Sequence, residues 1–393
     1  MKKILFVHHV SLIGGASYCL LSIIKELDRS VYEPVVLLRS NGPLVDELDK
    51  IKVKVIYCPT LWCYPYNKSL FDIRNWLTIY RLYHSLSDFE ILLEKCNPDI
   101  VYFNNTFLFP YLSVTQRIGK KSVIHIREHW PINEHVNQLH YIQKQILSKA
   151  DGIVAINNYS AQMISANNPK ITVIYDWIDL ETRYEPIPLH GVFGEDTSNL
   201  KIYLYTGGLQ SAKGAYEVLK TFSTKIKDIN SRLLVLGFTK DYSEHADNGM
   251  IRRLLLHFGH YSYEYKVKSL AQKDKRIKCI SSIYNIKDLL DQSYCMLSYF
   301  TIPHANLAMA EAMIEKLPCV AARTEESLEY TDNGNYAMLF DMNDIDSFER
   351  CVDDIDNKYS DIKIKLQYNE SIIRRMFSKE DNCKRLFSML SSL

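Results

Sequence analysis

Two segments in the second half of the chain have residue types and spacings suited to binding a phosphate ester and a sugar. Residues 205–214 (YTGGLQSAKG) predict the end of a buried strand, a glycine turn and a lysine, Lys213, at the start of a helix. Such a turn brings backbone amides and one fixed cation to the edge of a sheet, where they can hold a diphosphate. Residues 310–321 (AEAMIEKLPCVA) place Glu311 early in a helix, where its carboxylate can accept hydrogen bonds from sugar hydroxyls. Together the segments predict a nucleotide-sugar site.

Each of these side chains also has a structural interpretation. A lysine at a helix amino terminus is disfavoured by the helix dipole, at a cost of no more than about 1 kcal/mol. Lys213 is therefore either compensated by an anion or a solvated surface lysine. Glu311 lies among small apolar residues, so it is either a capping residue or a ligand contact. We also include the glycines Gly207, Gly208 and Gly237 among the predicted substrate-binding residues.

Polar and glycine residues also follow predicted strands in the first half of the chain. Gly14 and Gly15 lie where the first strand turns into a helix, which indicates either a plain tight turn or a place where a ligand approaches the backbone. The strand at 122–126 leads into the sequence RE and then His129, and the strand at 100–103 leads into Asn104 and its neighbour. Polar residues at the carboxyl ends of parallel strands face the crevice where ligands bind. For His129 a hydrogen-bonded structural role is the alternative.

The elements that must position these residues alternate between short apolar strands and helices, which predicts an α/β fold of parallel sheets covered on both faces. The expected strands of the first domain are 4–7, 35–38, 53–57, 100–103, 122–126 and 153–156, and those of the second are 202–205, 233–236, 295–298, 319–322 and 338–340. Residues 181–199 are rich in Pro and Gly and predict a linker. We therefore expect domains at 1–180 and 200–371, with closing helices at 372–393.

Length and composition exclude several classes of protein. A chain of 393 residues is too long for one ordinary core, so two domains are expected. The formal net charge of +1 gives no bulk attraction to nucleic acid. Of the nine scattered cysteines, Cys58 and Cys63 are close enough to share a zinc ion, but no second pair with ligand spacing follows them, so we expect reduced thiols in a cytoplasmic protein. No apolar run is long enough to cross a bilayer, so any contact with the inner membrane would be at its surface.

Aromatic and basic residues gather between positions 62 and 83. Such residues suit a bilayer interface, a sugar-stacking surface or a domain core. Because leucine and isoleucine are interspersed, we expect most of them to lie in the core. The residues are Trp62, Tyr64, Tyr66, Trp76, Tyr80, Arg81 and Tyr83.

The order of the motifs resembles that of the retaining GT-B glycosyltransferases of family 4. The resemblance covers nearly the whole chain, through residues 14–16 (GGA), residues 150–154 (ADGIV) and the segments around Lys213 and Glu311. It implies two facing Rossmann-like domains with an interdomain cleft. The donor site would lie mainly in the second domain and the acceptor site mainly in the first, which the terminal helix would rejoin.

The resemblance also implies roles for individual residues. Lys213 would meet the donor phosphates and Glu311 the nucleotide ribose, while His129 would lie beside the transferred sugar. Arg127 and Glu128 would form an ion pair that shapes the loop, and Asn104 would contact the acceptor.

The chain departs from the family pattern at two positions. An arginine usual in the family is replaced by Gly208, and a glutamate usual eight residues before Glu311 is replaced by Pro303. We expect the neighbouring segment to supply the missing sugar contact. Its residues are His304, Ala305 and Asn306.

We expect neither a metal nor a cofactor beyond the nucleoside diphosphate sugar, which serves as co-substrate. Residues 344–346 and 354–356 have Asp-x-Asp spacing, but they lie in a polar late segment and are interpreted as solvated helix caps. Helix amino termini and Lys213 can stabilise a leaving diphosphate instead.

The expected activity is metal-independent hexosyl transfer to a saccharide or lipid-linked saccharide in bacterial surface polysaccharide synthesis. A non-catalytic nucleotide-sugar-binding partner of another transferase and a sugar-nucleotide epimerase on the same two-domain plan are the alternatives. The first would bind donor without forming product, and the second would convert the donor alone.

Overall fold

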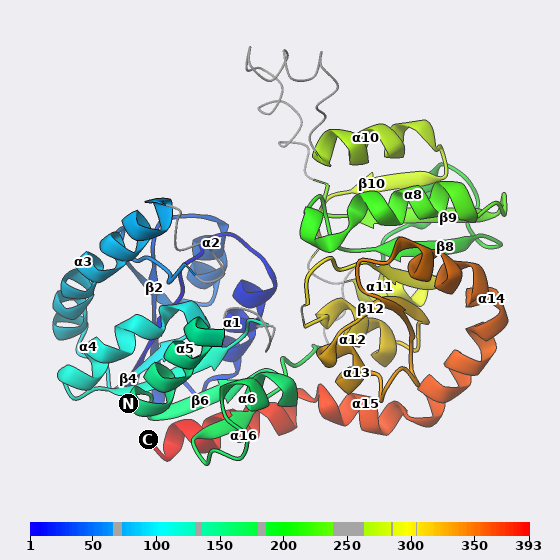
Figure 1. Ribbon diagram of the computed structural model, residues 1–393. Coiled ribbons are helices and arrows are strands. Elements are labelled where there is room, and N and C mark those ends of the chain that lie inside the picture. The colour runs from blue at the N-terminus through cyan, green and yellow to red at the C-terminus, as the bar shows by residue number, and fades with distance from the viewer. Residues whose placement is uncertain (66–72, 130–135, 180–185, 239–262, 284–285, 304) are drawn as a thin grey trace, which may run out of the picture. The chain divides into compact units, whose positions relative to one another are not determined.

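The computed structural model describes residues 1–65, 73–129, 136–179, 186–238, 263–283, 286–303 and 305–393. The chain forms two compact units, each of which contains one parallel sheet (Figure 1). The first unit consists of Met1–Trp177 and Phe377–Leu393, and the second of Ile178–Met376. The α/β class and the two Rossmann-like sheets expected from the sequence are thus confirmed.

The sheet of the first unit has seven strands in the order β3-β2-β1-β4-β5-β6-β7, and every neighbouring pair is parallel. The strands are β1 (Lys2–Val7), β2 (Tyr32–Leu38), β3 (Lys54–Tyr57), β4 (Ile100–Phe103), β5 (Lys121–Ile126), β6 (Gly152–Ala155) and β7 (Ile171–Val173). The order of the strands reverses between β1 and β4. In open parallel sheets, ligands bind beyond the carboxyl ends of the strands at such a point.

Helices cover both faces of this sheet because the side chains of each strand alternate between two hydrophobic cores. Leu5 and Val7 enter one core with α3, α4, α5 and α6, whereas Ile4 and Phe6 enter the other with α1, α2 and α16. The helices of the unit are α1 (Gly15–Glu26), α2 (Pro43–Lys50), α3 (Ile73–Cys96), η1 (Thr106–Tyr111), α4 (Leu112–Arg117), α5 (Val136–Lys149), α6 (Asn158–Ile164) and α16 (Lys379–Ser391).

The last helix, α16, is part of the first unit although it comes at the end of the chain. Cys383, Leu386 and Leu390 lie in the core that contains Ile4. The Oδ1 atom of Asn382 accepts a hydrogen bond of 3.1 Å from the backbone N–H of Tyr175, which follows β7. Apolar burial and this buried polar contact together hold the helix against the sheet.

The sheet of the second unit has six parallel strands in the order β10-β9-β8-β11-β12-β13, and its order reverses between β8 and β11. The strands are β8 (Lys201–Tyr205), β9 (Ser231–Leu236), β10 (Ile277–Ile280), β11 (Cys295–Ser298), β12 (Cys319–Arg323) and β13 (Met338–Asp341). The helices are α7 (Leu189–Phe193), η2 (Ser211–Lys213), α8 (Ala215–Lys225), α10 (Tyr263–Lys273), α11 (Lys287–Asp291), α12 (Leu307–Ile314), α13 (Glu325–Tyr330), α14 (Ile345–Tyr368) and α15 (Glu370–Met376).

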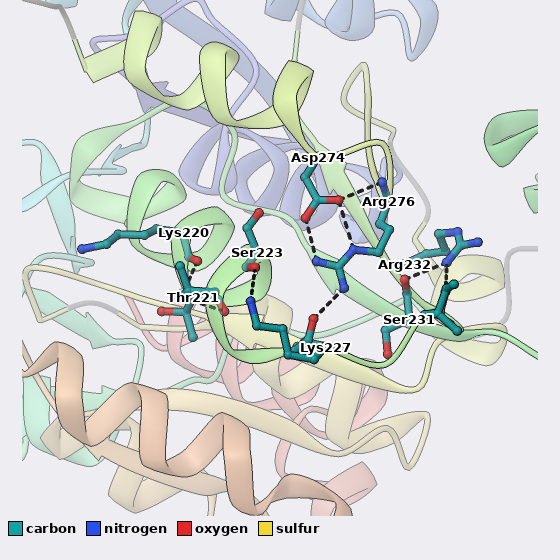
Figure 2. A network of polar contacts seen from close by, with 11 residues as sticks. Lys220, Thr221, Ser223, Lys227, Ser231, Arg232, Asp274 and Arg276 are labelled. Carbon is teal, nitrogen blue, oxygen red and sulfur yellow. Dashed lines mark hydrogen bonds and ion pairs between the residues drawn. The ribbon is translucent and has the colours of Figure 1, made fainter.

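The amino-terminal edge of this sheet is fixed by arginine contacts (Figure 2). Arg276 donates to the Asp274 carboxylate at 2.7 and 3.0 Å, and its Nη1 donates to the carbonyl of Ile226, where α8 ends. Arg232 on β9 donates to the carbonyl of Ile229 at 2.7 Å. These contacts join the end of α8 to the starts of β9 and β10, so they position the opposite, carboxyl-terminal edge.

Several expectations about elements were wrong. Part of the predicted linker folds into α7, whose buried Leu189 and Phe193 belong to the second unit. Strands β7 and β10 were not predicted, because one is only three residues long and the other is interrupted by Lys278. Among the described residues, no helix combines the length and hydropathy needed to cross a membrane.

The aromatic residues between positions 62 and 83 are divided between core and surface. Trp62 and Tyr64 pack against the core of the first unit. Trp76, Tyr80 and Tyr83 are 56%, 63% and 50% exposed on α3, so the expectation that most of the group is buried was wrong for them. Arg81 is also exposed, and Tyr66 lies outside the described residues.

Candidate functional site

In the second unit, the turn after β8 touches the end of β9 and the turn that follows it through backbone atoms. Gly208 has φ +64° and Gly237 has φ +91°, and both values favour glycine. A Cβ atom added to Gly237 would lie 2.7 Å from the Cα of Gly208. The backbone N–H of Gly208 donates to the carbonyl of Leu236 at 3.1 Å. No side chain fits between the two turns, so they form a compact backbone surface at the carboxyl edge of the sheet.

The side chain of Tyr205, the last residue of β8, contacts the backbone of the same turn. Its hydroxyl donates to the carbonyl of Lys213 at 3.0 Å and lies 3.3 Å from the carbonyl of Gly208. A Cβ atom at Gly207 would overlap this hydroxyl. The buried tyrosine therefore requires glycine at position 207 and fixes the path of the chain from β8 to Lys213.

Lys213 ends the short helix η2 and precedes Gly214, a left-handed residue from which α8 begins. Its Nζ atom lies 4.2 Å from the ring centroid of Phe300, which follows β11. Lys213 forms no ion pair with any described residue, and burial lowers its pKa to about 8. It is thus not a solvated surface lysine, and an anionic ligand would favour its charged form.

Glu311 lies on the first turns of α12 and is half-buried. Burial raises the pKa of its carboxyl to about 7. The cap of α12 is Asn306, whose Oδ1 accepts from the backbone N–H of Met309 at 3.1 Å. Glu311 is therefore not the cap of this helix. Its carboxylate makes no hydrogen bond or ion pair within the described part of the chain, which leaves it available to a ligand hydroxyl.

The residues expected to supply the sugar contact of the missing family glutamate lie in the segment between β11 and α12. Asn306 is buried, and its Nδ2 donates to the Ser298 hydroxyl at 2.8 Å while its Oδ1 caps α12. Both polar atoms of its amide are thus engaged, and the expectation of a direct sugar contact by this side chain is not supported. Ala305 is half-buried beside it, and His304 lies outside the described residues.

Loops after β8 and β11 touch at the point where the strand order reverses. The backbone N–H of Thr301 donates to the carbonyl of Ala212 at 3.1 Å. A Cβ atom at Gly214 would overlap the backbone of Tyr299. The glycine turns and Lys213 are thereby brought to the loop that leads into α12, the helix that carries Glu311.

In the first unit, Asn104 lies at the centre of a buried polar network. Its Nδ2 donates to Nδ1 of His8 at 3.2 Å and to the carbonyl of Ala16 at 3.1 Å. Its Oδ1 accepts from Nε of Arg127 at 3.0 Å. Asn104 has no exposed surface and all its polar atoms are used, so the expected acceptor contact is not supported.

His8 extends the network to helix α1. Burial, with the nearby His9 and Arg127, lowers the pKa of His8 to about 3, so its ring is neutral. Because Nδ1 accepts from Asn104, Nε2 carries the proton and donates to the Ser17 hydroxyl at 3.1 Å. Ser17 in turn donates to the carbonyl of Leu12 at 2.7 Å. The chain of contacts fixes the turn between β1 and α1.

Arg127 and Glu128 do not form the expected ion pair. Arg127 donates through Nη1 to both carboxylate oxygens of Asp176, at 2.8 and 2.9 Å. Glu128 accepts from the side chain of Asn105 and, at 3.0 Å, from the backbone N–H of Thr106. Consecutive residues leaving a strand project to opposite sides, which separates the two side chains. Burial raises the pKa of Glu128.

Gly14 and Gly15 are the predicted residues of this edge that the structure leaves exposed, and His129 is half-buried. Gly14 and Gly15 are exposed at the start of α1, and a Cβ atom added at either one would meet no atom within 4 Å. The capping residue Gly14 makes no side-chain hydrogen bond to this helix, so the first backbone N–H groups have no partner in the cap. His129 is half-buried, and its ring stacks on that of Tyr159 at 4.8 Å.

The sequence interpretation missed three members of this network, namely His8, Ser17 and Asp176. His8 follows the first strand directly, and its place at a strand end was a signal that could have found it. Asp176 is 49 residues from Arg127 in the sequence, and no local sequence pattern indicated that the two side chains would pair. Within the described residues, no group of three His, Cys, Asp or Glu side chains is arranged to hold a metal ion.

The Asp-x-Asp segments have separate structural roles. Asp344 caps α14 and accepts from the backbone N–H of Ser347 at 3.0 Å, as expected of a helix cap. Asp356 lies within α14 and pairs with Lys201 at 2.6 Å, so the cap interpretation was wrong for the second segment.

Comparisons with known proteins agree with this architecture. Residues 13–182 match the family model described as Glycosyltransferase Family 4. No curated protein sequence matches the chain. The structure is similar to that of HepE from Anabaena in complex with UDP and glucose, with a TM-score of 0.74, 16% identity and 100% of both chains covered. A glycosyltransferase from Rickettsia africae matches with a TM-score of 0.69 and 17% identity, over 99% of this chain and 97% of that one.

A third solved structure, the lipopolysaccharide outer core galactosyltransferase WaaB, matches with a TM-score of 0.60 and 16% identity, over 100% of this chain and 99% of that one. At these identities the solved structures establish the fold. The family 4 glycosyltransferase resemblance seen in the motifs is thus supported in residues 13–182, and over its whole length the chain has the same two-sheet fold as these solved structures.

Proposed function

We propose that this protein is a retaining glycosyltransferase that moves a sugar from a nucleoside diphosphate sugar to a hydroxyl of a saccharide or lipid-linked saccharide. The observation that carries the proposal is the state of Lys213 and Glu311. Lys213 is a half-buried cation and Glu311 a half-buried carboxylate, and neither has a charged partner among the described residues. Desolvated charges without partners are costly unless a ligand binds them, and such groups gather at functional sites.

The chemistry assigned to these groups follows from their positions. The backbone amides of the glycine turns and the Lys213 ammonium would bind the donor diphosphate and stabilise the charge that develops on it. Glu311 would accept hydrogen bonds from hydroxyls of the nucleotide ribose. His129 would donate to, or accept from, a hydroxyl of the transferred sugar. We propose that these groups stabilise the phosphate charge without a metal ion.

The transfer step is written as attack on the donor's own face. The acceptor oxygen forms a bond to the anomeric carbon as the bond from that carbon to the phosphate oxygen breaks. The departing phosphate oxygen takes the acceptor proton, so no protein nucleophile is needed and the anomeric configuration is retained. The protein contributes orientation of the two substrates and stabilisation of the phosphate charge.

UDP-glucose is the first donor to test, because HepE was crystallised with UDP and glucose. The likeness to a lipopolysaccharide galactosyltransferase favours a role in bacterial surface polysaccharide synthesis, such as capsule, O-antigen or exopolysaccharide. Cytoplasmic donor pools are consistent with this role, and we propose a cytoplasmic protein with contact at the inner membrane surface.

A panel of UDP, GDP, ADP and dTDP sugars in a thermal-shift measurement tests donor binding, because a ligand that binds the folded state raises Tm. The hit is then incubated as radiolabelled donor with saccharide acceptors and with EDTA. Product formed in EDTA supports the proposal. Saturable binding without product would identify a non-catalytic partner, and conversion of the donor alone would identify an epimerase.

A further inference from the structure

Two guanidinium groups in the first unit lie over one indole ring, and neither has an acidic partner among the residues that the structure describes. Arg39 follows β2, and its Cζ atom lies 3.9 Å from the ring centroid of Trp62. Arg81 on α3 places its Cζ atom 5.2 Å from the same centroid. Neither arginine makes a hydrogen bond or an ion pair with any of the described residues. Both guanidinium groups keep their positive charge at neutral pH, so the pair is a local excess of positive charge.

The platform between the two arginines is held rigidly. The backbone N–H of Trp62 donates to the Tyr111 hydroxyl at 3.0 Å, and that buried tyrosine also contacts Ser85 of α3 at 2.6 Å. The indole itself is half-buried and packs against the core of the unit. A fixed ring keeps both guanidinium groups in place before any ligand arrives, which lowers the entropy lost on binding.

A guanidinium binds phosphate through two parallel N–H donors and is the side chain best suited to recognising it. The contact with the indole ring is weak at an exposed site and leaves the positive charge of each arginine in place. The Arg39–Trp62–Arg81 cluster therefore has the chemistry of an anion-binding site.

Helix α3, which carries Arg81, also has an exposed apolar stripe over its first half. The stripe is 50–73% exposed and consists of Ile73, Trp76, Leu77, Tyr80 and Tyr83. At 100° per residue it lies opposite the face on which Leu82 and Phe89 are buried, so it is not an extension of the core. The charged residues between 73 and 84 are both basic, Arg74 and Arg81.

Tryptophan and tyrosine with flanking arginines on an exposed helix face are typical of a surface that lies in a membrane interface. Arg81 of the cluster lies on α3 next in sequence to Tyr80 of the stripe, so the same helix carries the positive charge and the apolar side chains. Positive charge beside apolar side chains is complementary to lipid phosphate above acyl chains, and not to a small soluble anion alone.

We propose that the Arg39–Trp62–Arg81 cluster and the exposed stripe of α3 form a docking surface for an anionic lipid bilayer. The two arginines bind lipid phosphate, and the aromatic side chains enter the headgroup region. This inference deepens the proposed function, because docking on a bilayer would bring the protein to a lipid-linked acceptor. Only this biological role of docking rests on the proposed function. Lipid binding itself needs no donor and can be measured separately.

The test is flotation of the full chain, without donor, with vesicles of phosphatidylcholine alone or with about one third phosphatidylglycerol. We expect binding to the anionic vesicles only. Each basic residue near such a surface contributes roughly fivefold in affinity, so the R39Q/R81Q double variant should bind on the order of 30-fold more weakly. The W76S/Y80S double variant should also lose binding, since it removes the inserted side chains.

Matched controls are R29Q, which removes an exposed arginine of the same unit, and I229S, which removes an exposed apolar side chain of the second unit. Both should float as wild type does. The changed side chains of the test variants are partly or largely exposed, and their Tm should match wild type.

The proposal would be overturned by equal binding to neutral and anionic vesicles, or by wild-type flotation of R39Q/R81Q. Binding of inorganic phosphate to the cluster without flotation would assign a soluble anion in place of a lipid. Thermal shift of R39Q/R81Q by the donor should equal that of wild type. If the wild-type protein binds no donor, the proposed function is overturned. The flotation measurements would still decide the lipid proposal by themselves.

Discussion

The Nζ atom of Lys213 lies 4.2 Å from the centroid of the Phe300 ring, and no carboxylate in the described part of the chain neutralises it. The ring provides a partly apolar, weakly attractive contact for the cation. Because Lys213 follows β8 and Phe300 follows β11, their contact lies where the order of the second sheet reverses. A cation is thus held at the position where open parallel sheets bind ligands, and it lacks the anion that would stabilise it.

Lys213→Met should reduce kcat/KM for the donor by about 100-fold or more, which is the range for loss of one group that stabilises charge in a transition state. Folding should not suffer, because partial burial disfavours the charged amine and no described residue forms an ion pair with it. The measurement is initial-rate transfer together with a thermal melt. Lys220→Met removes an exposed lysine of α8, the helix that follows Lys213, and should leave the rate unchanged. Wild-type kinetics in K213M would contradict the assignment.

Glu311→Gln should raise the donor KM more than it lowers kcat, because the carboxylate is assigned to the ribose and not to the reacting atoms. Its folded pKa of about 7 is above the ordinary value of 4.5, so ionised Glu311 lowers stability as pH rises from 4.5 through 7. At pH 8 the variant should therefore melt at or above the wild-type temperature. Glu325→Gln, at an exposed glutamate, is the matched control. A fall in Tm with normal donor KM would show that Glu311 is structural.

Donor affinity should depend on pH through both groups. Glu311 becomes ionised as pH rises through about 7, and Lys213 loses its charge as pH rises through about 8. A bound diphosphate stabilises the ammonium form and shifts its loss upward. Binding should therefore be best in the interval between these values and weaker at pH 5.5 and pH 10. In K213M the decrease in donor affinity between pH 8 and pH 10 should disappear. If that decrease persists, a group other than Lys213 causes it.

Two glycine substitutions should have opposite effects on stability. Gly237→Ala places a Cβ atom 2.7 Å from the Cα of Gly208 and imposes φ +91° on a residue with a side chain, so a loss of several kcal/mol in the free energy of unfolding is expected. Gly15→Ala meets open space at the start of α1 and should leave Tm equal or higher. Urea unfolding compares the two. If G15A also lowers acceptor affinity, a ligand approaches this turn.

Asp176→Asn should destabilise the first unit by about 3–5 kcal/mol, because it leaves the buried charge of Arg127 without its ion-pair partner. Asp151→Asn, at a more exposed carboxylate paired with Lys121, should cost no more than about 1 kcal/mol. Chemical unfolding gives both values. Equal small losses would mean that Arg127 finds another partner.

Apolar periodicity predicted most strands of both sheets, because buried parallel strands are almost continuously apolar. The same argument failed for β7 and β10, which are short and only partly buried. Glycine and strand-end signals placed Lys213, Glu311 and the turn glycines at the edge of one sheet. They also marked Asn104 and Arg127, whose side chains turn inward. Strand ends carry both ligand contacts and buried networks, and a sequence pattern does not state which way a side chain points.

Long-range partners account for most of the remaining errors. Arg127 pairs with Asp176 and not with the adjacent Glu128, and only the packing of β5 against the segment after β7 brings those two residues together. The exposed aromatic residues of α3 had the spacing of a helix face, but periodicity alone could not distinguish a face toward the core from one toward solvent.

Calorimetric titration of UDP-glucose into wild-type protein, K213M and K220M, with EDTA present, tests the central claim most directly. We predict saturable binding by wild type and K220M, and at least tenfold weaker binding by K213M at unchanged Tm. Equal affinity in all three proteins would show that Lys213 does not hold the donor phosphates and would contradict the account.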